Sequence, residues 1–144
     1  MPLFNRQRRV RIDVRPFDPF LERLAEALGH QETEFMITLV SDRAMQELNR
    51  RFRGTDRPTD VLSFPAEEDS RLWKHLPGEE TPGLGEIIIS AETARRQADE
   101  EGHSLQEEIK LLIIHGALHL KGFDHESDGG VMNRKEYALR ARLL

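Results

Sequence analysis

Three of the six histidines in this chain of 144 residues lie within one stretch of eleven residues, HGALHLKGFDH. His115 and His119 are four residues apart on a predicted helix, so their rings lie about 40° apart around the axis, one turn above the other. Gly122 supplies a reversal after the helix, and His125 follows three residues later. Three neutral nitrogen ligands, with a fourth position left to water, form the pattern of a catalytic zinc site. The spacing therefore predicts one Zn²⁺ ion per chain on His115, His119 and His125.

The segment around these histidines is apolar on all sides, which is typical of a core helix. A buried imidazole without a partner costs roughly 1–3 kcal/mol, and one shared ion would satisfy both rings. The alternative is that they are ordinary core or helix-end histidines, which is the commoner interpretation of an isolated HxxxH pair. The chain has no cysteine, so any metal site must use His, Asp or Glu.

The position after the first histidine separates this motif from the zincin motif HExxH. In HExxH the Glu is the general base of a metalloprotease, whereas here the position is Gly116. Peptidase activity through that base is therefore not expected. The metal ion itself, or a side chain from another part of the fold, would then have to activate the water. Asp124 and Glu126 flank His125 and are candidates either for this role or for orienting a ligand ring.

A second group of residues with chemical potential lies upstream, where Arg50, Arg51, Arg53 and Arg57 fall within eight positions. The net charge of −5 argues against a generally basic nucleic-acid binder. A local phosphate-binding patch and a solvated helix end both fit the arginine cluster.

The loop after these arginines adds Thr59, Asp60 and Ser63. Together with Arg53 these side chains could hold a phosphate diester, because guanidinium presents a planar fork to phosphate oxygens. The alternative is a turn held by local hydrogen bonds, with Thr59 or Asp60 capping backbone groups. Composition alone favours neither interpretation.

Hydrophobic periodicity and capping residues predict the elements that position these groups. Strands are expected at 10–14, 35–40, 61–64 and 85–90, helices at 20–28, 42–53, 91–101, 105–121 and 132–143, and a surface excursion at 65–83. This pattern predicts an α+β fold (an α/β sandwich), in which about five helices cover one small mixed four-stranded sheet. The zinc site would lie on a central helix and the turn after it. A length of 144 residues fits one domain, 1–144.

The chain contains no apolar run near the roughly 20 residues that a membrane span requires, and its N-terminus lacks the apolar region of a secretory signal. The absence of cysteine suits a reducing compartment. We therefore expect a soluble protein of the cytoplasm, without a membrane partner.

The two segments together resemble the YbeY family, bacterial rRNA maturation factors described as metal-dependent endoribonucleases. The likeness spans about residues 35–140. The matching positions are Leu48-Asn49, Arg53-Gly54, 58–65, 84–87, His115-Gly116, 118–120, Gly122, Asp124-His125, Met132 and Glu136. One departure is Glu86, because the family usually carries Asp there.

The resemblance implies zinc on His115, His119 and His125, and a functional Arg53 facing the metal across a cleft. It implies a single-strand-type endoribonuclease that acts in rRNA maturation, at the 3′ end of the small-subunit RNA, and in ribosome quality control. The implied partners are ribosomal RNA and the ribosome or small-subunit assembly proteins. His115 and Arg53 would be catalytic, and Arg53, Thr59, Asp60 and Ser63 would bind substrate.

Two alternatives stay open on the sequence. One is a ribosome-assembly module in which zinc is structural and no catalysis occurs. The other is a metallohydrolase that acts on an amide or a small phosphoester.

Overall fold

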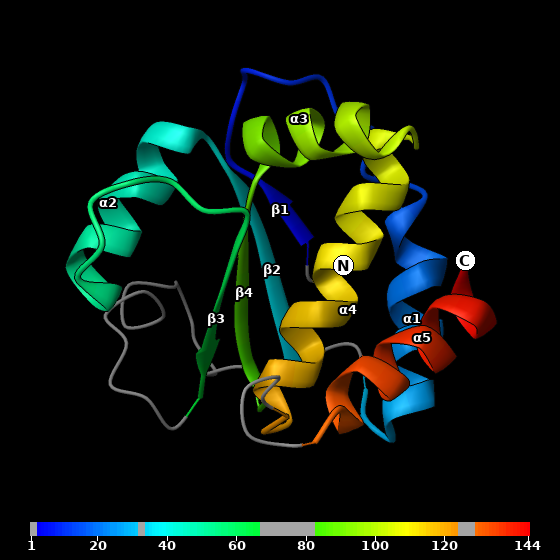
Figure 1. Ribbon diagram of the computed structural model, residues 1–144. Helices are drawn as coiled ribbons and strands as arrows, with labels where there is room; N and C mark the ends of the chain where they lie inside the picture. The colour runs from blue at the N-terminus through cyan, green and yellow to red at the C-terminus, as the bar shows by residue number, and fades with distance from the viewer. Residues whose placement is uncertain (1–2, 32–33, 67–82, 124–128) are drawn as a thin grey trace.

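The structure, a computed structural model, describes residues 3–31, 34–66, 83–123 and 129–144 (Figure 1). These residues form four strands and five helices. In chain order they are β1 (Leu3–Asn5), α1 (Phe17–Leu28), β2 (Phe35–Val40), α2 (Asp42–Arg53), β3 (Val61–Pro65), β4 (Gly85–Ser90), α3 (Ala91–Glu101), α4 (Leu105–Leu120) and α5 (Val131–Leu143). The predicted α+β fold, with five helices around a small sheet, is confirmed.

The four strands make one mixed sheet in the order β1-β2-β4-β3. β1, β2 and β4 run parallel, and β3 pairs with β4 in the antiparallel direction, with Ser63 opposite Ile87. β3 is therefore an edge strand, and its outer backbone groups are open to side chains from either face of the sheet.

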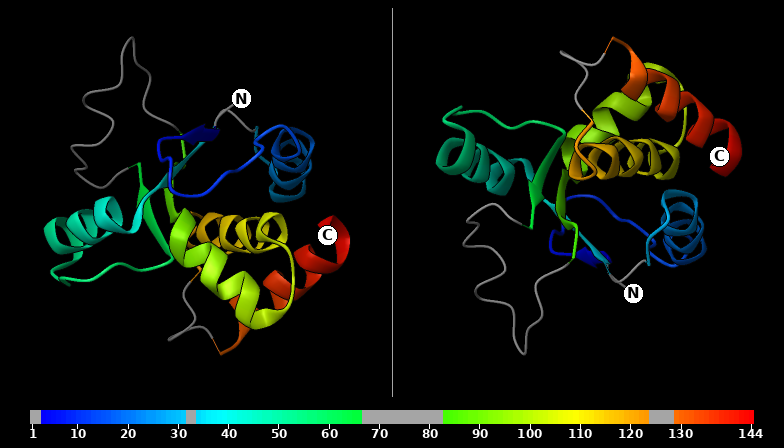
Figure 2. Two further views of the ribbon diagram at one scale, coloured as in Figure 1. Left: turned by 90° about the horizontal axis from the view of Figure 1, so that it is seen from above. Right: turned by 90° about the horizontal axis from the view of Figure 1, so that it is seen from below.

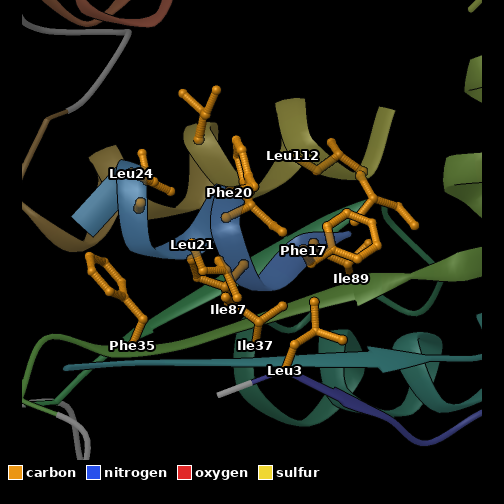
Figure 3. Packing of buried hydrophobic residues seen from close by; sticks show 14 of the residues in the cluster. Leu3, Phe17, Phe20, Leu21, Leu24, Phe35, Ile37, Ile87, Ile89 and Leu112 are labelled. Carbon is orange, nitrogen blue, oxygen red and sulfur yellow. The ribbon is translucent and has the colours of Figure 1, made fainter. Parts of the chain in front are cut away.

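The two faces of the sheet bury side chains against different helices, as the views along the sheet show (Figure 2). On β4, Ile87 and Ile89 belong to the large core with α1, α4 and α5, whereas Ile88 belongs to a smaller core with Met45 of α2. Successive side chains of a strand point to opposite faces, so one run of isoleucines serves both cores. Figure 3 shows the large core closing between α1, α4 and the sheet.

Three helices begin at the serine caps expected from the sequence. Ser41 Oγ accepts from the Ala44 N–H at 3.2 Å, and Ser104 Oγ accepts from the Glu107 N–H at 3.1 Å. Ser90 caps α3 in the same manner. These bonds satisfy N–H groups that the helices themselves leave without partners.

The expected strand at 10–14 is wrong. The first strand is Leu3–Asn5, which pairs in parallel with β2, and residues 10–14 are irregular. Val10 is buried, and Ile12 and Val14 pack against the large core. The alternating apolar side chains therefore indicate which side of the segment faces the core, but no strand among the described residues pairs with its backbone.

The first helix begins earlier than expected, at Phe17 instead of Phe20. Pro19 lies in its first turn, where a missing N–H costs no intrahelical hydrogen bond. Most of the expected surface excursion, residues 67–82, lies outside the described residues. Across the described ranges, no helix is both long and apolar enough to cross a membrane.

Candidate functional site

The end of α4 fixes the position of His119. The Gly122 N–H donates to the His119 carbonyl at 2.9 Å, and the Phe123 N–H donates to the Leu118 carbonyl at 3.1 Å. Gly122 has a φ of 95°. This is a Schellman motif, in which a glycine with positive φ ends the helix and the last carbonyls find donors. The predicted role of Gly122 as the helix stop is confirmed, and the last turn of α4 is held rigidly.

His115 and His119 form a close pair on one side of α4. Their Nε2 atoms are 3.0 Å apart and their ring centroids 4.6 Å apart. On the far side of His115, Nδ1 lies 2.6 Å from Oε1 of Glu136 on α5. A carboxylate only accepts, so Glu136 suits an N–H at Nδ1, and this contact turns Nε2 of His115 towards His119. A carboxylate behind a histidine is a common support for a metal ligand.

The donor set fits part of the expected zinc site. Two nitrogens bound to one tetrahedral zinc ion are about 3.3 Å apart, since each Zn–N bond is about 2.0–2.1 Å long. The observed 3.0 Å requires only a small separation of the rings. His125, expected as the third ligand, lies outside the described residues, as do Asp124 and Glu126. Within the described part of the chain, no three His, Cys, Asp or Glu side chains gather closely enough to hold a metal ion.

Arg53 lies at the edge strand β3 and lines a cleft together with the two histidines. It is the last residue of α2, which packs on the other face of the sheet from α4. One guanidinium N–H donates to the Ser63 carbonyl at 2.8 Å, and the guanidinium carbon lies 4.7 Å from the centroid of the Phe64 ring. The hydrogen bond and the cation–π contact hold the guanidinium plane in place.

Gly116 explains why the zincin glutamate has no counterpart here. A Cβ at this position would lie 2.8 Å from Cγ2 of Ile87 and 3.1 Å from Oγ of Ser63. Ser63 Oγ donates to the Gly116 carbonyl at 3.1 Å. The glycine thus lets α4 approach β3 and β4 closely, and this close approach brings the histidine pair up to the edge of the sheet.

A cleft of about 330 Å³ joins these groups. Its described lining is Arg53, Val61, Leu62, Ser63, Pro65, His115 and His119. The two imidazoles lie half-buried on one wall and the guanidinium lies on another. The sequence placed the histidines and Arg53 in separate motifs, and the fold brings them to one cleft.

Thr59 and Asp60, two of the expected substrate-binding residues, hold the loop before β3. Asp60 Oδ1 accepts from the Val61 N–H at 2.7 Å and lies 3.4 Å from the Thr59 hydroxyl, while the Asp60 carbonyl accepts from the Ser90 N–H at 2.9 Å. Asn49 of α2 donates to the Arg57 carbonyl at 2.9 Å. Neither Thr59 nor Asp60 is among the described residues that line the cleft.

Glu86 is buried on the face of the sheet that α2 covers, with 6% of its surface exposed. Its Oε2 accepts from the Thr38 hydroxyl at 2.9 Å, and its Oε1 has no hydrogen-bond partner among the described residues. Burial raises the pKa of the Glu86 carboxyl, and the Thr38 hydrogen bond and the charge of Arg6 only partly oppose the rise.

Glu136 is the site residue that reasoning from motifs passed over. It matched the family in the tail of the chain, but it is 21 residues beyond His115, on another helix, and no spacing rule connects the two. Its contact with His115 depends on how α5 packs on α4.

The sequence profile of the family described as Endoribonuclease YbeY matches residues 3–143. A protein named Endoribonuclease YbeY from Aquifex aeolicus is 43% identical over 124 residues, which cover 86% of this chain and 76% of the relative. Its counterpart from Sulfurovum sp. is 47% identical over 118 residues, or 81% of this chain and 75% of that protein.

A solved structure is also similar. The solution structure of TM1509 from Thermotoga maritima matches with a TM-score of 0.60 and 28% sequence identity, and the match covers 98% of this chain and 88% of that one. The likeness therefore extends over the whole of the fold described above.

Proposed function

The chain belongs to the YbeY family of endoribonucleases, and on that premise we propose that its cleft between His115, His119 and Arg53 binds and hydrolyses single-stranded RNA. The observation that carries the proposal is the convergence of two imidazoles and one guanidinium on a single cleft. These are the groups that a phosphodiester hydrolase needs: ligands for a metal ion and a cation for the phosphate.

The histidine pair and Glu136 are proposed to form the metal-binding side of the cleft. His115 and His119 would ligate Zn²⁺, one ion per chain, with His125 as third ligand and Glu136 holding the His115 ring by its Nδ1–H. When bound, such an ion polarises a phosphoryl oxygen and lowers the pKa of a bound water. The residues' own task is to present both Nε2 atoms to one point.

Arg53 and Ser63 are proposed to form the substrate side. The guanidinium donates to the Ser63 carbonyl at 2.8 Å and to the Phe52 carbonyl at 3.3 Å, which anchors it at the cleft, and its planar fork is the geometry that a phosphate group accepts. Thr59 and Asp60 shape the loop that carries β3 into the cleft, and RNA contact by these two residues stays a prediction. The role of His115 and Arg53 in catalysis is part of the same proposal.

The wider role is also a proposal. Residues 1–144 would act as a single metallo-endoribonuclease domain in the cytoplasm. Its substrate would be ribosomal RNA, cleaved near the 3′ end of the small-subunit RNA. Its protein partners would be the ribosome or small-subunit assembly proteins. The resemblance to the family supports this role.

The experiment that tests the proposal measures metal content and RNA cleavage on the same purified samples. We expect about one divalent ion per chain and metal-dependent cleavage of single-stranded RNA. His115→Ala should lose both the ion and thermal stability, because ion binding is linked to folding. A casein-type peptidase assay run alongside should stay negative.

Arg53→Ala separates substrate binding from metal binding. It should keep the ion and the fold but lose most cleavage, and Arg53→Lys should recover only part of it, since a point charge does not replace the planar fork. Arg50→Ala is the matched control, because Arg50 lies on the same helix end and pairs with Glu47 instead of facing the cleft. Full activity in Arg53→Ala would refute the role of Arg53. An ion bound without any RNA cleavage would favour a structural zinc module.

A further inference from the structure

The edge strand β3 forms one wall of the cleft and presents main-chain groups there as well as side chains (Figure 1). In an antiparallel pair, residues alternate between those whose N–H and C=O point at the partner strand and those whose N–H and C=O point away from it. An edge strand therefore turns every second N–H and C=O towards whatever lies beside the sheet.

The hydrogen bonds just beyond the two ends of β3 decide which of its residues point outward. The Ser90 N–H donates to the Asp60 carbonyl at 2.9 Å. At the other end, the Ala66 N–H donates to the Leu84 carbonyl at 3.0 Å. Asp60 and Ala66 thus face β4, and so does every second residue between them. The residues of β3 whose N–H and C=O point away from β4 are Val61, Ser63 and Pro65.

Of these outward positions, Ser63 is the one with an open N–H. The Val61 N–H donates to the Asp60 carboxylate at 2.7 Å. Pro65 has no N–H, which suits a proline on an edge strand. The Ser63 N–H forms no hydrogen bond with any residue that the structure describes. Because Ser63 lines the cleft, this donor is open to a group bound there.

The hydroxyl of Ser63 is engaged elsewhere. Its Oγ donates to the Gly116 carbonyl at 3.1 Å and so ties β3 to α4. The close approach at Gly116 packs the hydroxyl, since a Cβ on that glycine would lie 3.1 Å from Oγ. The hydroxyl proton is therefore used within the fold. The donor that Ser63 offers to an anion is its main-chain N–H.

Arg53 lies on the same side of β3 as this N–H. The N–H and C=O of one residue in an antiparallel strand point the same way, and the guanidinium donates to the Ser63 carbonyl at 2.8 Å. The guanidinium therefore lies beside the Ser63 N–H along the edge of the sheet. The Asp60 carboxylate occupies the neighbouring outward position at Val61, which disfavours an anion there and favours one at Ser63.

We propose that the main-chain N–H of Ser63 binds the RNA phosphate that Arg53 binds, so that the two donors hold oxygens of one phosphate group. A hydrogen bond from a backbone N–H to an ionised acceptor is stronger than one between neutral groups. The pairing of β3 with β4 fixes the strand, so this donor needs little reorganisation when the phosphate arrives. The inference rests on the proposed function, since it assumes a phosphodiester at Arg53.

The first test measures amide hydrogen exchange in the full wild-type chain, labelled with ¹⁵N. The probe is a 2′-O-methyl oligouridine, which a gel must show to be intact after the measurement. Without RNA, the Ser63 amide should exchange faster than those of Leu62 and Phe64, which face β4 and serve as internal controls. Saturating RNA should slow Ser63 exchange roughly tenfold or more, in line with a hydrogen bond to a charged group. The Ser63 amide proton should also shift downfield.

The second test removes the N–H. Ser63→Pro lacks this donor but keeps the carbonyl that holds Arg53. Ser63→Ala is the matched variant, because it loses the same hydroxyl and keeps the N–H. In a fluorescence anisotropy titration, Ser63→Pro should bind the oligouridine roughly tenfold more weakly than Ser63→Ala, the usual effect of a hydrogen bond to a charged group. Proline is tolerated at outward positions of an edge strand, as at Pro65. Thermal melts check that both variants fold.

The outcomes separate this inference from the proposed function. Unchanged Ser63 exchange in RNA-saturated wild-type protein would overturn the inference, whether or not Ser63→Pro folds, and so would equal affinities of the two folded variants. Cleavage by the wild type and its loss in Arg53→Ala would still uphold the cleft. A wild-type protein that neither binds nor cleaves RNA would overturn both. Protection of Ser63 by an extended peptide and not by RNA would assign the open edge to strand addition and overturn the inference.

Discussion

At the scale of single residues, the site depends on contacts that hold an imidazole ring and a guanidinium group in one orientation. His115 is held by Glu136, and Arg53 is held by the Ser63 carbonyl and the Phe64 ring. Each anchor fixes the orientation of its partner at the wall of the cleft. Preorganisation of this kind reduces the reorganisation needed when substrate binds.

Glu136→Gln tests the support behind His115. Glutamine keeps the size but loses the charge, so the Nδ1–H tautomer is favoured less strongly. We expect the fold to persist and divalent-ion affinity to fall roughly tenfold or more, as is typical when the partner of a metal ligand is changed. Chelator competition measures the affinity, and ¹⁵N NMR of His115 reports the tautomer. Unchanged affinity and an unchanged tautomer would contradict the role.

Glu86→Gln tests the buried carboxyl. Its pKa is raised in the folded state, so the folded state holds the proton more tightly than the unfolded chain. The stability that protonation gives is complete below the unfolded pKa of about 4.3 and is lost as pH rises through the folded pKa. Glu86→Gln should therefore raise the melting temperature at pH 7 and give little gain near pH 4. Thermal melts at both values, with Glu22→Gln as an exposed control, check this, and a lower melting temperature at pH 7 would refute it.

At the scale of elements, two close contacts set where the helices lie. Gly116 brings α4 against the sheet, and a network around Asp42 joins the start of α2 to the start of α3. Both contacts involve segments that are distant in the sequence. Neither element would reach its position through its own hydrogen bonds.

Gly116→Ala tests the approach of α4. The added methyl would lie 2.8 Å from Ile87 and 3.1 Å from Ser63, so α4 must move away from β3 and β4. We expect a loss of about 1–3 kcal/mol in unfolding free energy, the usual cost of overpacking, in spite of the better helix propensity of alanine. Urea unfolding measures the loss. A variant as stable as the wild type would show that the space between Gly116, Ile87 and Ser63 can accept a methyl group without cost.

Asp42→Asn tests the junction of α2 and α3. Asp42 Oδ1 accepts from the Ser90 and Thr93 hydroxyls at 2.5 and 2.6 Å, and Oδ2 lies 2.9 Å from Arg96. Burial disfavours the charge of Asp42, but these hydrogen bonds and the charge of Arg96 outweigh it and hold the pKa below 3.8.

The sign of the effect follows from that lowered pKa. The stability due to ionised Asp42 is complete above the unfolded pKa and is lost as pH falls through the folded one. Asp42→Asn should cost about 1–3 kcal/mol at pH 7, the range for hydrogen bonds to a charged group. The deficit should shrink as pH falls below the unfolded pKa of about 3.9. Denaturant titrations at pH 7 and pH 3 decide this, and an equal deficit at both values would exclude a charge effect.

At the scale of the whole molecule, the distribution of charge matters more than its sum. The net charge is −5, yet α5 carries four basic residues against one acid, and the last turn of α2 carries three arginines. Cations thus gather at the end of α2, where Arg53 lines the cleft, and along α5. An acidic chain with local cationic surfaces can bind RNA at few phosphates only.

The salt dependence of RNA binding measures how many phosphates the protein contacts. With two or three contacts, the slope of log affinity against log salt should be about −1.4 to −2.1 for single-stranded RNA. Anisotropy titrations between low and moderate salt give the slope. A slope steeper than about −5 would indicate a broad electrostatic surface and contradict this picture.

The local sequence was enough to determine much of this protein. Serine caps, the stop at Gly122 and the alternation of β4 follow from hydrogen bonds and side-chain directions that act over a few residues. The four-residue spacing of His115 and His119 predicted their shared side of α4 for the same reason. The expected strand at 10–14 failed because alternation records which side faces a core, whereas pairing requires a partner strand.

Only the tertiary structure decided how the separate parts of the site meet. Arg53 reaches the cleft because β3 is an edge strand, and strand order is set by packing between segments far apart in the chain. Glu136 reaches His115 because α5 lies on α4, and Gly116 is needed because Ile87 and Ser63 lie against it. These contacts depend on distances between elements, which local spacing rules do not encode.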